Sequence, residues 1–336
     1  MLFRSLLHKP RRLPAAPAIV RLENIAVPEL QTKPETSPEA PSEGSAAATS
    51  KVIAVVNQKG GVGKTTTAIN LAAGLALEGI PTLLIDCDPQ GNATGGLGVA
   101  RSEDRLSVYD LLSGSNLSEA VQKTEVENLS IVPGSKNMIG ANLELVGADR
   151  REFRLRDALE AARSDYPFII LDCPPALDLL TLNALVAADG LLVPMQAEYF
   201  ALEGITELMQ TLDRVAQGFN PSLALEGVLL TMFDDRTNLS QQVAANLKTF
   251  FGDKLYATTI PRNVRLAEAP SHGKPVQVYD PRSRGAEAYT ALALELLQRS
   301  GIKNRKTKAK AKAAENGSCT AVPVEKKSPK FWPYNK

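Results

Sequence analysis

Cysteine is scarce in this chain, and long apolar runs are absent. The 336 residues include only Cys87, Cys173 and Cys319, whose spacing forms neither a disulfide framework nor a metal-binding motif. No apolar run reaches the length of a membrane span, and no apolar core of a secretory signal peptide is present. We therefore expect reduced thiols and a cytoplasmic protein that does not attach to membranes.

Net charge is almost absent from the chain as a whole but is unevenly distributed. The total is +1 at pH 7, yet residues 301–336 have ten basic side chains against two acidic ones, a balance of +8. Residues 1–50 have six basic against five acidic side chains, which leaves −8 for residues 51–300. A basic segment of this kind either binds nucleic-acid phosphates or only solubilises the protein, and the sequence leaves both open.

The two ends also differ from the middle in composition. Residues 1–50 are rich in Pro, Ser, Ala and Glu without clear periodicity, which predicts a mostly disordered arm. Early prolines in its basic first part argue against the amphipathic helix of a mitochondrial transit peptide, so contact with DNA or a partner is favoured. Residues 301–336 are predicted to form a disordered Lys-rich tail, and residues 51–300 a single domain.

A glycine-rich loop at 57–67, NQKGGVGKTTT, is the strongest chemical signal in the chain. It follows the β-branched run 51–56 and precedes a helical pattern at 66–77, so strand, loop and helix come in the order that a phosphate-binding loop requires. Its glycines let backbone N–H groups surround a phosphate chain at the helix N-terminus. Lys64 would add a positive charge beside the outer phosphates, and Thr65 would place its hydroxyl on Mg²⁺.

Two further predicted strands end in carboxylates. In the run 83–94, LLIDCDPQGNAT, Asp86 and Asp88 lie on the same side of the chain while it stays extended. In the run 168–175, FIILDCPP, Asp172 suits a Walker B aspartate that holds Mg²⁺ through water. An isolated aspartate at a strand end more often caps the following helix, but three motifs in this order favour a nucleotide site.

Strand-like runs alternate with helical stretches throughout residues 51–300. This alternation predicts an α/β fold, a single P-loop NTPase domain with a mostly parallel twisted sheet flanked by helices, with ligands at the carboxyl ends of the strands. The runs expected to form strands are 52–56, 82–86, 129–132, 168–172, 190–194, 226–231 and 256–260.

The loop departs from the common P-loop pattern, which would require a glycine at Gln58, and carries an extra lysine, Lys59. It resembles the variant K-G-G-x-G-K-[ST] of the ParA/MinD family of P-loop ATPases. The resemblance implies that Lys59 reaches the partner subunit's nucleotide across a dimer interface and that Lys59, Lys64 and Asp88 are catalytic, with Asp88 orienting the attacking water. It also assigns Thr65, Asp86 and Asp172 to Mg²⁺. The loop residues implied to bind ATP are Lys59, Gly60, Gly61, Val62, Gly63, Lys64, Thr65 and Thr66.

Later segments resemble the chromosome-partitioning branch of this family, ParA or Soj. They are 196–204, 231–243, 260–270 (IPRNVRLAEAP) and 279–289 (YDPRSRGAEAY), so the resemblance extends through residues 51–300. It implies that Pro261 and Asn263 contact adenine. It also implies that Arg236 and Arg265 bind non-specific DNA, with Arg262, Arg282 and Arg284 widening the patch.

These parts imply a cycle in which ATP and Mg²⁺ join two subunits, the dimer binds nucleoid DNA, and a ParB-type centromere-binding partner stimulates hydrolysis and release. A MinD-type division regulator would need a C-terminal amphipathic membrane helix, and 303–330 has no coherent apolar face. An iron-sulfur carrier would need cysteines placed between subunits. A non-hydrolytic scaffold and a regulator of replication initiation stay open, although Asp88 argues against the scaffold.

Overall fold

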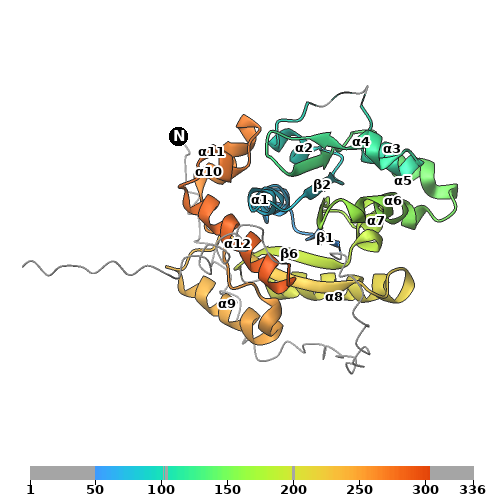
Figure 1. Cartoon of the computed structure of the whole chain (residues 1–336). Coiled ribbons are helices and arrows are strands. Elements are labelled where there is room, and N and C mark those ends of the chain that lie inside the picture. Colours follow the sequence, from blue (N-terminus) through green and yellow to red (C-terminus); the bar gives the residue numbers. More distant parts are fainter. Residues whose placement is uncertain (1–49, 101, 103–104, 199–200, 303–336) are drawn as a thin grey trace, which may run out of the picture. The chain divides into compact units, whose positions relative to one another are not determined.

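The computed structural model describes residues 50–100, 102, 105–198 and 201–302. The predictions of a disordered arm and of a disordered Lys-rich tail therefore lie outside the described residues, as does Cys319. The described residues form alternating strands and helices along the chain (Figure 1).

Within the described residues, seven strands form one sheet in the order β3-β4-β2-β5-β1-β6-β7. Neighbouring strands are parallel except for the antiparallel pair of β3 and β4. The inner strands are continuous apolar runs because helices cover both of their faces. The strands are β1 (Lys51–Val55), β2 (Thr82–Asp86), β3 (Gln122–Lys123), β4 (Leu129–Val132), β5 (Phe168–Asp172), β6 (Gly190–Gln196) and β7 (Ala224–Thr231).

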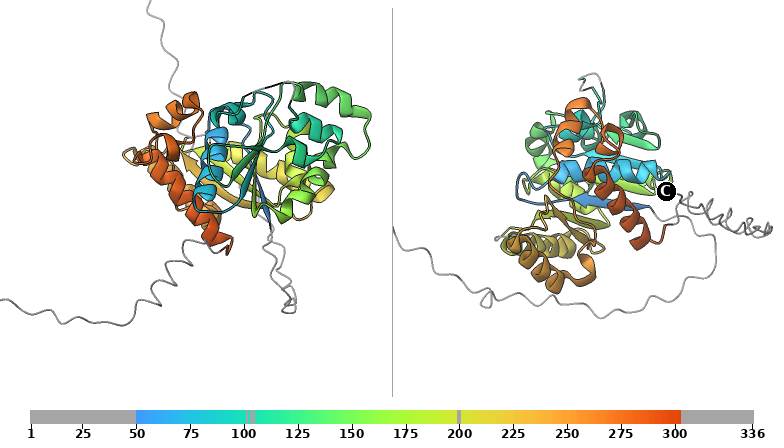
Figure 2. Two further views of the ribbon diagram at one scale, coloured as in Figure 1. Left: turned by 45° about the horizontal axis from the view of Figure 1, so that its top comes forward. Right: turned by 90° about the vertical axis from the view of Figure 1, so that its left-hand side faces the viewer.

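Helices flank the sheet on both sides (Figure 2). The α-helices in the described part are α1 (Lys64–Leu77), α2 (Asn92–Gly96), α3 (Val108–Ser113), α4 (Leu117–Ala120), α5 (Met138–Glu144), α6 (Arg154–Leu159), α7 (Leu179–Ala187), α8 (Ala201–Gly218), α9 (Asn238–Phe251), α10 (Val264–Glu268), α11 (Val276–Tyr279) and α12 (Arg284–Arg299). Short 3₁₀ turns are η2 (Leu145–Gly147), η3 (Arg151–Phe153), η4 (Glu160–Ser164), η5 (Gly252–Lys254) and η6 (Ala269–His272).

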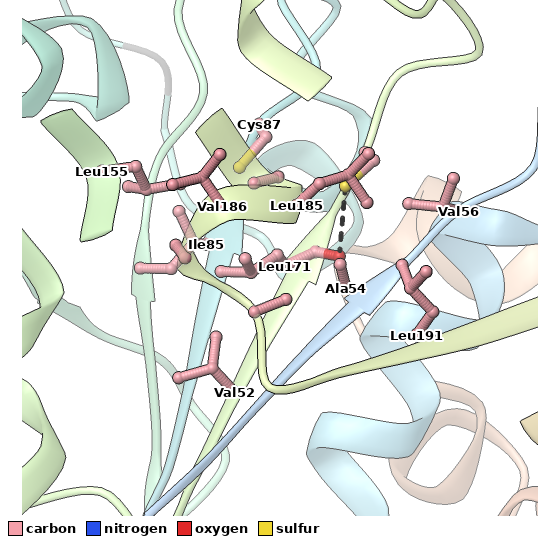
Figure 3. Packing of buried hydrophobic residues seen from close by; sticks show 14 of the residues in the cluster. Val52, Ala54, Val56, Ile85, Cys87, Leu155, Leu171, Leu185, Val186 and Leu191 are labelled. Atoms are coloured by element: carbon pink, nitrogen blue, oxygen red, sulfur yellow. Dashed lines mark hydrogen bonds between the residues drawn. The ribbon is translucent and has the colours of Figure 1, made fainter. Parts of the chain in front are cut away.

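Side chains of β1 point alternately into two apolar clusters, one on each face of the sheet. Val52 and Ala54 point into one cluster, which also contains side chains of α6, α7 and α8, whereas Ile53 and Val55 point into the other, with α1 and α12. Figure 3 shows the first cluster, where Ala54 lies near Leu171 of β5. Because successive side chains of a strand point to opposite faces, one short strand anchors both layers of helices.

Helix α1 packs closely against α12 because of a glycine in its middle. A Cβ atom at Gly74 would lie 2.9 Å from the Cβ of Ala293, closer than such atoms pack. Nearer the start of α1, the Thr67 hydroxyl and the Tyr289 hydroxyl are 3.0 Å apart and share a buried hydrogen bond. The last described helix therefore fixes the helix that follows the glycine-rich loop.

The predicted fold class is confirmed, and six of the seven expected strands are present within a few residues of their expected bounds. The expected strand 256–260 is wrong. Tyr256 N and Ile260 N donate to carbonyls of β7, but Ala257 N and Thr258 N donate to the carboxylate of Glu295, 2.9 Å away in each case. A side chain thus takes the hydrogen bonds that would continue the ladder. Strand β3, with two residues, was not expected.

Candidate nucleotide-binding site

The glycine-rich loop connects β1 to α1 at the carboxyl end of β1, an inner strand of the sheet. Gly61 and Gly63 have φ values of 74° and 88°, in the left-handed region that only glycine adopts readily. Gly63 is also the N-cap residue of α1, so the first N–H groups of the helix face the loop without a side-chain cap. The loop is therefore shaped, by its glycines, as an anion-binding helix N-terminus.

The neighbouring strands hold the loop in place through its carbonyl groups. The Thr231 hydroxyl donates to Val62 O at 2.7 Å, and Gln196 Nε2 donates to Gly61 O at 3.2 Å. Asn57 Nδ2 donates to a carbonyl of β6 at 2.8 Å. Sequence reasoning did not assign Asn57, Gln196 or Thr231 to the site. Their positions at the carboxyl ends of parallel strands were the available signal.

The two lysines of the loop lie in different environments. Lys64 is 8% exposed, and its ammonium donates to Lys59 O at 3.0 Å. Burial lowers the pKa of Lys64, although the nearby charge of Asp172 opposes that shift. The side chain of Lys59 is 56% exposed and forms an ion pair with Glu198, just after β6. Lys64 is therefore fixed against the loop, whereas Lys59 lies at the surface.

Register places two of the predicted carboxylates side by side. Asp86 and Asp172 are paired residues at the ends of β2 and β5, and both are fully buried. Neither carboxylate oxygen of Asp172 receives a hydrogen bond of ordinary geometry, although the Thr65 hydroxyl lies near it. Burial and the charge of Asp86 raise the pKa of Asp172 well above its usual range. Asp172 is therefore a buried carboxylate whose oxygens lack hydrogen bonds, with the Lys64 ammonium as the nearby opposite charge.

Asp86 is occupied by its own loop. Its Oδ2 accepts from Thr94 N at 2.8 Å and from the Thr94 hydroxyl at 2.6 Å, and its Oδ1 accepts from Asp88 N at 3.3 Å. Burial raises the pKa of Asp86 to about 6, against the opposing effect of these hydrogen bonds. The Thr94 hydroxyl also accepts from Gly134 N at 3.0 Å, so Asp86 fixes the loop that carries Asp88.

Asp88 lies beside the buried lysine. It is 9% exposed, and its Oδ1 accepts from Gln90 N at 2.8 Å. The negative charge of Asp88 acts to raise the pKa of both Lys64 and Asp172, so the three groups are close enough to interact electrostatically. The predicted water-orienting residue, the phosphate lysine and the Walker B aspartate are thus brought together.

The donor atoms here fit Mg²⁺. Asp172 offers two free carboxylate oxygens and Thr65 a hydroxyl, and hard oxygen donors are what Mg²⁺ prefers. Among the described residues, no group of three His, Cys, Asp or Glu side chains could hold a metal without further ligands. Magnesium commonly takes one or two protein ligands and completes its shell with phosphates and water. Asp86 is less available because both of its oxygens accept hydrogen bonds.

The predicted adenine loop lies at the same edge of the sheet. Pro261 forms an isolated parallel bridge with Phe233, two residues beyond Thr231, which holds the glycine-rich loop. Asn263 caps α10, where its side chain accepts from Arg265 N at 2.8 Å. Its backbone position beside β7 is therefore compatible with the predicted base contact, while its side chain is engaged in the cap.

The predicted DNA-binding arginines are exposed, and two of them are paired with carboxylates. Arg236 binds Asp234 with two hydrogen bonds of 2.8 Å, and Arg265 contacts Glu268 at 2.7 Å. Arg262 is exposed and forms no ion pair with any described residue. The other two predicted arginines, Arg282 and Arg284, are also exposed beside the start of α12.

The fold and the site together define a P-loop nucleoside triphosphatase: a mostly parallel sheet with a glycine loop after an inner strand, a buried lysine within that loop, and carboxylates at nearby strand ends. Residues 50–225 match the family model described as an AAA domain. No helix among the described residues is long and apolar enough to cross a membrane.

Curated relatives share about half of their residues with this chain. The Soj sporulation initiation inhibitor protein of Bacillus subtilis is 54% identical over 247 residues, which are 73% of this chain and 98% of that protein. The chromosome partitioning protein ParA of Caulobacter vibrioides is 51% identical over 252 residues, 74% of this chain and 94% of that protein. The chain belongs to the ParA/Soj family of chromosome-partitioning ATPases, which confirms the resemblance found in the sequence.

Solved structures share the same architecture. Cobyrinic acid a,c-diamide synthase of Mycobacterium smegmatis with bound ADP and magnesium has a TM-score of 0.65 at 35% identity, covering 76% of this chain and 98% of that one. The septum site-determining protein MinD of Pyrococcus horikoshii, complexed with Mg-ADP, has a TM-score of 0.62 at 26% identity, covering 76% and 99%. Proteins of different names thus use this fold to hold a nucleotide with magnesium.

Proposed function

We propose that this ATPase partitions chromosomal or plasmid DNA by switching between an ATP-bound dimer that binds DNA and a form that releases it. The observation that carries the proposal is the difference in exposure between the two lysines of the loop. Lys64 is buried against the loop, where one subunit's phosphates would lie, while Lys59 is exposed and accessible to a second molecule. A lysine at the surface of a phosphate loop is suited to reach the nucleotide of a partner.

The residues of the site divide into binding and turnover roles. The loop 59–66 would surround the ATP phosphates with N–H groups, and Lys64 would place its charge on the outer phosphates. Thr65 and Asp172 would hold Mg²⁺, with Asp86 beside them. When bound, magnesium neutralises charge on the phosphate oxygens. Asp88 would orient the attacking water, since its carboxylate lies within the field of both Lys64 and Asp172.

The dimer would combine the arginines of two subunits into one surface for DNA. Arg236 lies in the loop after β7, Arg262 in the predicted adenine loop and Arg265 in α10, so the same edge of the sheet would serve nucleotide and DNA. Phosphate contacts position a protein on DNA without reading bases, so binding should be independent of sequence. A ParB-type partner would stimulate hydrolysis and release the dimer, and the protein would be associated with the nucleoid in the cytoplasm.

The decisive experiment measures binding of the full-length chain to random-sequence duplex DNA at one fixed salt concentration. The three conditions are ATP with Mg²⁺, ADP with Mg²⁺, and no nucleotide, with Lys64→Ala as the control that weakens phosphate binding. Strong binding with ATP alone supports the switch. Binding that is indifferent to nucleotide, or equal in Lys64→Ala, contradicts it and favours the scaffold or replication-regulator reading.

A further inference from the structure

The two loops that carry the predicted DNA-binding arginines are adjacent. Phe233 N donates to Ile260 O at 2.9 Å, and Phe233 forms a parallel bridge with Pro261. Arg236 lies on the loop between β7 and α9, and Arg262 lies on the loop that precedes α10. Both act on Asp234: its pKa is lowered to about 2, mainly by hydrogen bonds from Arg236, with a smaller contribution from Arg262. An acidic side chain thus stands within the basic surface.

Asp234 occupies one of the two edges through which the Arg236 guanidinium can form paired hydrogen bonds. The guanidinium donates from Nε to Oδ1 and from Nη2 to Oδ2, each at 2.8 Å, and the backbone N–H of Arg236 also donates to Oδ1 at 3.1 Å. The Arg236 side chain is 84% exposed, so this pairing takes place in solvent. The carboxylate is held by its own turn, and it remains beside the arginine even if one side-chain hydrogen bond opens.

Arg265 is held in the same manner by two acids. Nη1 contacts Glu268 at 2.7 Å, and Nε contacts Asp280 at 3.2 Å. The Tyr279 hydroxyl donates to Glu268 at 3.3 Å, and the hydrogen bond from Arg265 is the main cause of the lowered pKa of Glu268. Helices α10 and α11, which carry these groups, lie together in Figure 1. The donors of this guanidinium are therefore shared among internal carboxylates.

A carboxylate presents two oxygens to a guanidinium in much the same fork as a DNA phosphate does. We propose that Asp234 and Glu268 compete with DNA phosphates for Arg236 and Arg265 and so weaken the DNA binding of a single subunit. This inference rests on the proposed DNA-binding function. Each phosphate exchanges one charge-assisted pair for another, so a single contact adds little affinity. A dimer presents both pairs twice, and the summed contacts then suffice.

The test compares full-length Asp234→Asn and Glu268→Gln with the wild-type chain in binding to random-sequence duplex DNA, with ATP and with ADP, over a series of salt concentrations. Asp235→Asn is the matched control. This substitution removes the same charge from an exposed neighbouring residue, which forms no ion pair with Arg236 in the described structure. We expect Asp234→Asn and Glu268→Gln each to bind DNA roughly threefold to tenfold more tightly, including with ADP. The salt dependence should steepen by about one to two ions in Asp234→Asn, because the freed Arg236 neutralises a phosphate fully, and by less in Glu268→Gln, where Asp280 still contacts Arg265.

Two results would overturn the inference. If wild-type protein binds DNA with ATP and both variants match Asp235→Asn in affinity and salt slope, the acids do not compete. If the wild-type chain does not bind DNA with ATP at all, the DNA function itself is rejected, and the inference with it. The two variants lie on separate segments, so Glu268→Gln decides the question independently if Asp234→Asn disturbs its turn.

Discussion

Lys59 forms an ion pair with Glu198, which follows the strand beside the glycine-rich loop in the same chain. Both side chains are about half exposed, so the pair is accessible and weak. A second molecule that offers phosphate oxygens could therefore draw Lys59 away at little cost. In this structure the lysine is thus paired within its own chain.

The first prediction concerns Lys59 itself. Lys59→Ala should keep ATP binding, because Lys64 and the backbone N–H groups remain, but should lose ATP-dependent dimerisation and DNA binding. Equilibrium nucleotide binding and sedimentation with ATP measure the two properties separately. Glu198→Gln is the control, since it frees the lysine without removing it and should still dimerise. A Lys59→Ala chain that dimerised normally with ATP would exclude the role of this lysine in a partner's site.

The second prediction concerns the buried carboxylate of Asp172. Both of its oxygens lack hydrogen-bond partners, so its charge costs folding free energy in the absence of a ligand. Asp172→Asn should raise the unfolding free energy of the nucleotide-free chain by about 1 kcal/mol or more and should abolish Mg²⁺-dependent ATP turnover. Urea unfolding and phosphate release are the measurements.

A matched control for that substitution is Asp253→Asn, at an exposed position in η5, which should change neither quantity. If Asp172→Asn proved less stable than the wild type, the attraction between Asp172 and Lys64 would outweigh the cost of burying the carboxylate. Normal turnover in the same variant would remove Asp172 from the magnesium site.

The third prediction concerns Glu295, whose carboxylate accepts the hydrogen bonds of two backbone N–H groups, at residues 257 and 258. Burial alone would raise the pKa of Glu295, but hydrogen bonds from Ala257 N and Thr258 N and from Arg299 lower it below its ordinary value of 4.5. A lowered carboxylate pKa stabilises the fold fully above pH 4.5, and this contribution is lost as the pH falls through the lowered value. Glu295→Gln should therefore cost about 1–2 kcal/mol at pH 7 and less in acid.

Urea unfolding at pH 7 and below pH 4.5 would measure this difference. Glu287→Gln, exposed in the first turn of the same helix, removes the same charge without those hydrogen bonds and should have a smaller effect at both pH values. An equal loss of stability at the two pH values would show that the ionised form of Glu295 is not what matters.

The fourth prediction concerns the basic segment 303–336, which is outside the described residues. Deleting it removes ten basic and two acidic side chains but leaves α12 intact, as that helix ends at Arg299. The truncated chain should fold, bind DNA less tightly and show a flatter dependence of affinity on salt. An unchanged salt slope would mean that the segment does not contact DNA.

The sequence predicted those parts of the site whose chemistry is local. The glycine loop needs consecutive residues with left-handed backbone and a following helix, so Gly61, Gly63 and Lys64 were visible as a pattern. Asp86 and Asp172 were visible because each ends an apolar strand. Their pairing in register could not be read from either strand alone, since it depends on which strands are neighbours.

Contacts between distant segments were beyond the reach of sequence patterns. The run 256–260 has strand-like composition, but Glu295, almost forty residues later, takes two of its N–H groups. Likewise, Thr231 and Gln196 hold the glycine loop only because β6 and β7 follow β1 in the sheet. The carboxylates beside Arg236 and Arg265 were visible as neighbours in the sequence, but pairing with them requires the turn and helix that bring the groups together.

The strand order determines when β1 can pair with its neighbours during synthesis of the chain. Strand β1 is complete at Val55, but its two neighbours begin only at Phe168 and Gly190. At the rate of protein synthesis, β1 emerges on the order of ten seconds before the first of them. During that interval β1 and the glycine loop have no neighbouring strand with which to pair. The strand β1 and the glycine-rich loop are thus synthesised early but reach their folded structure late. A nascent chain interrupted before β6 would expose β1 to aggregation.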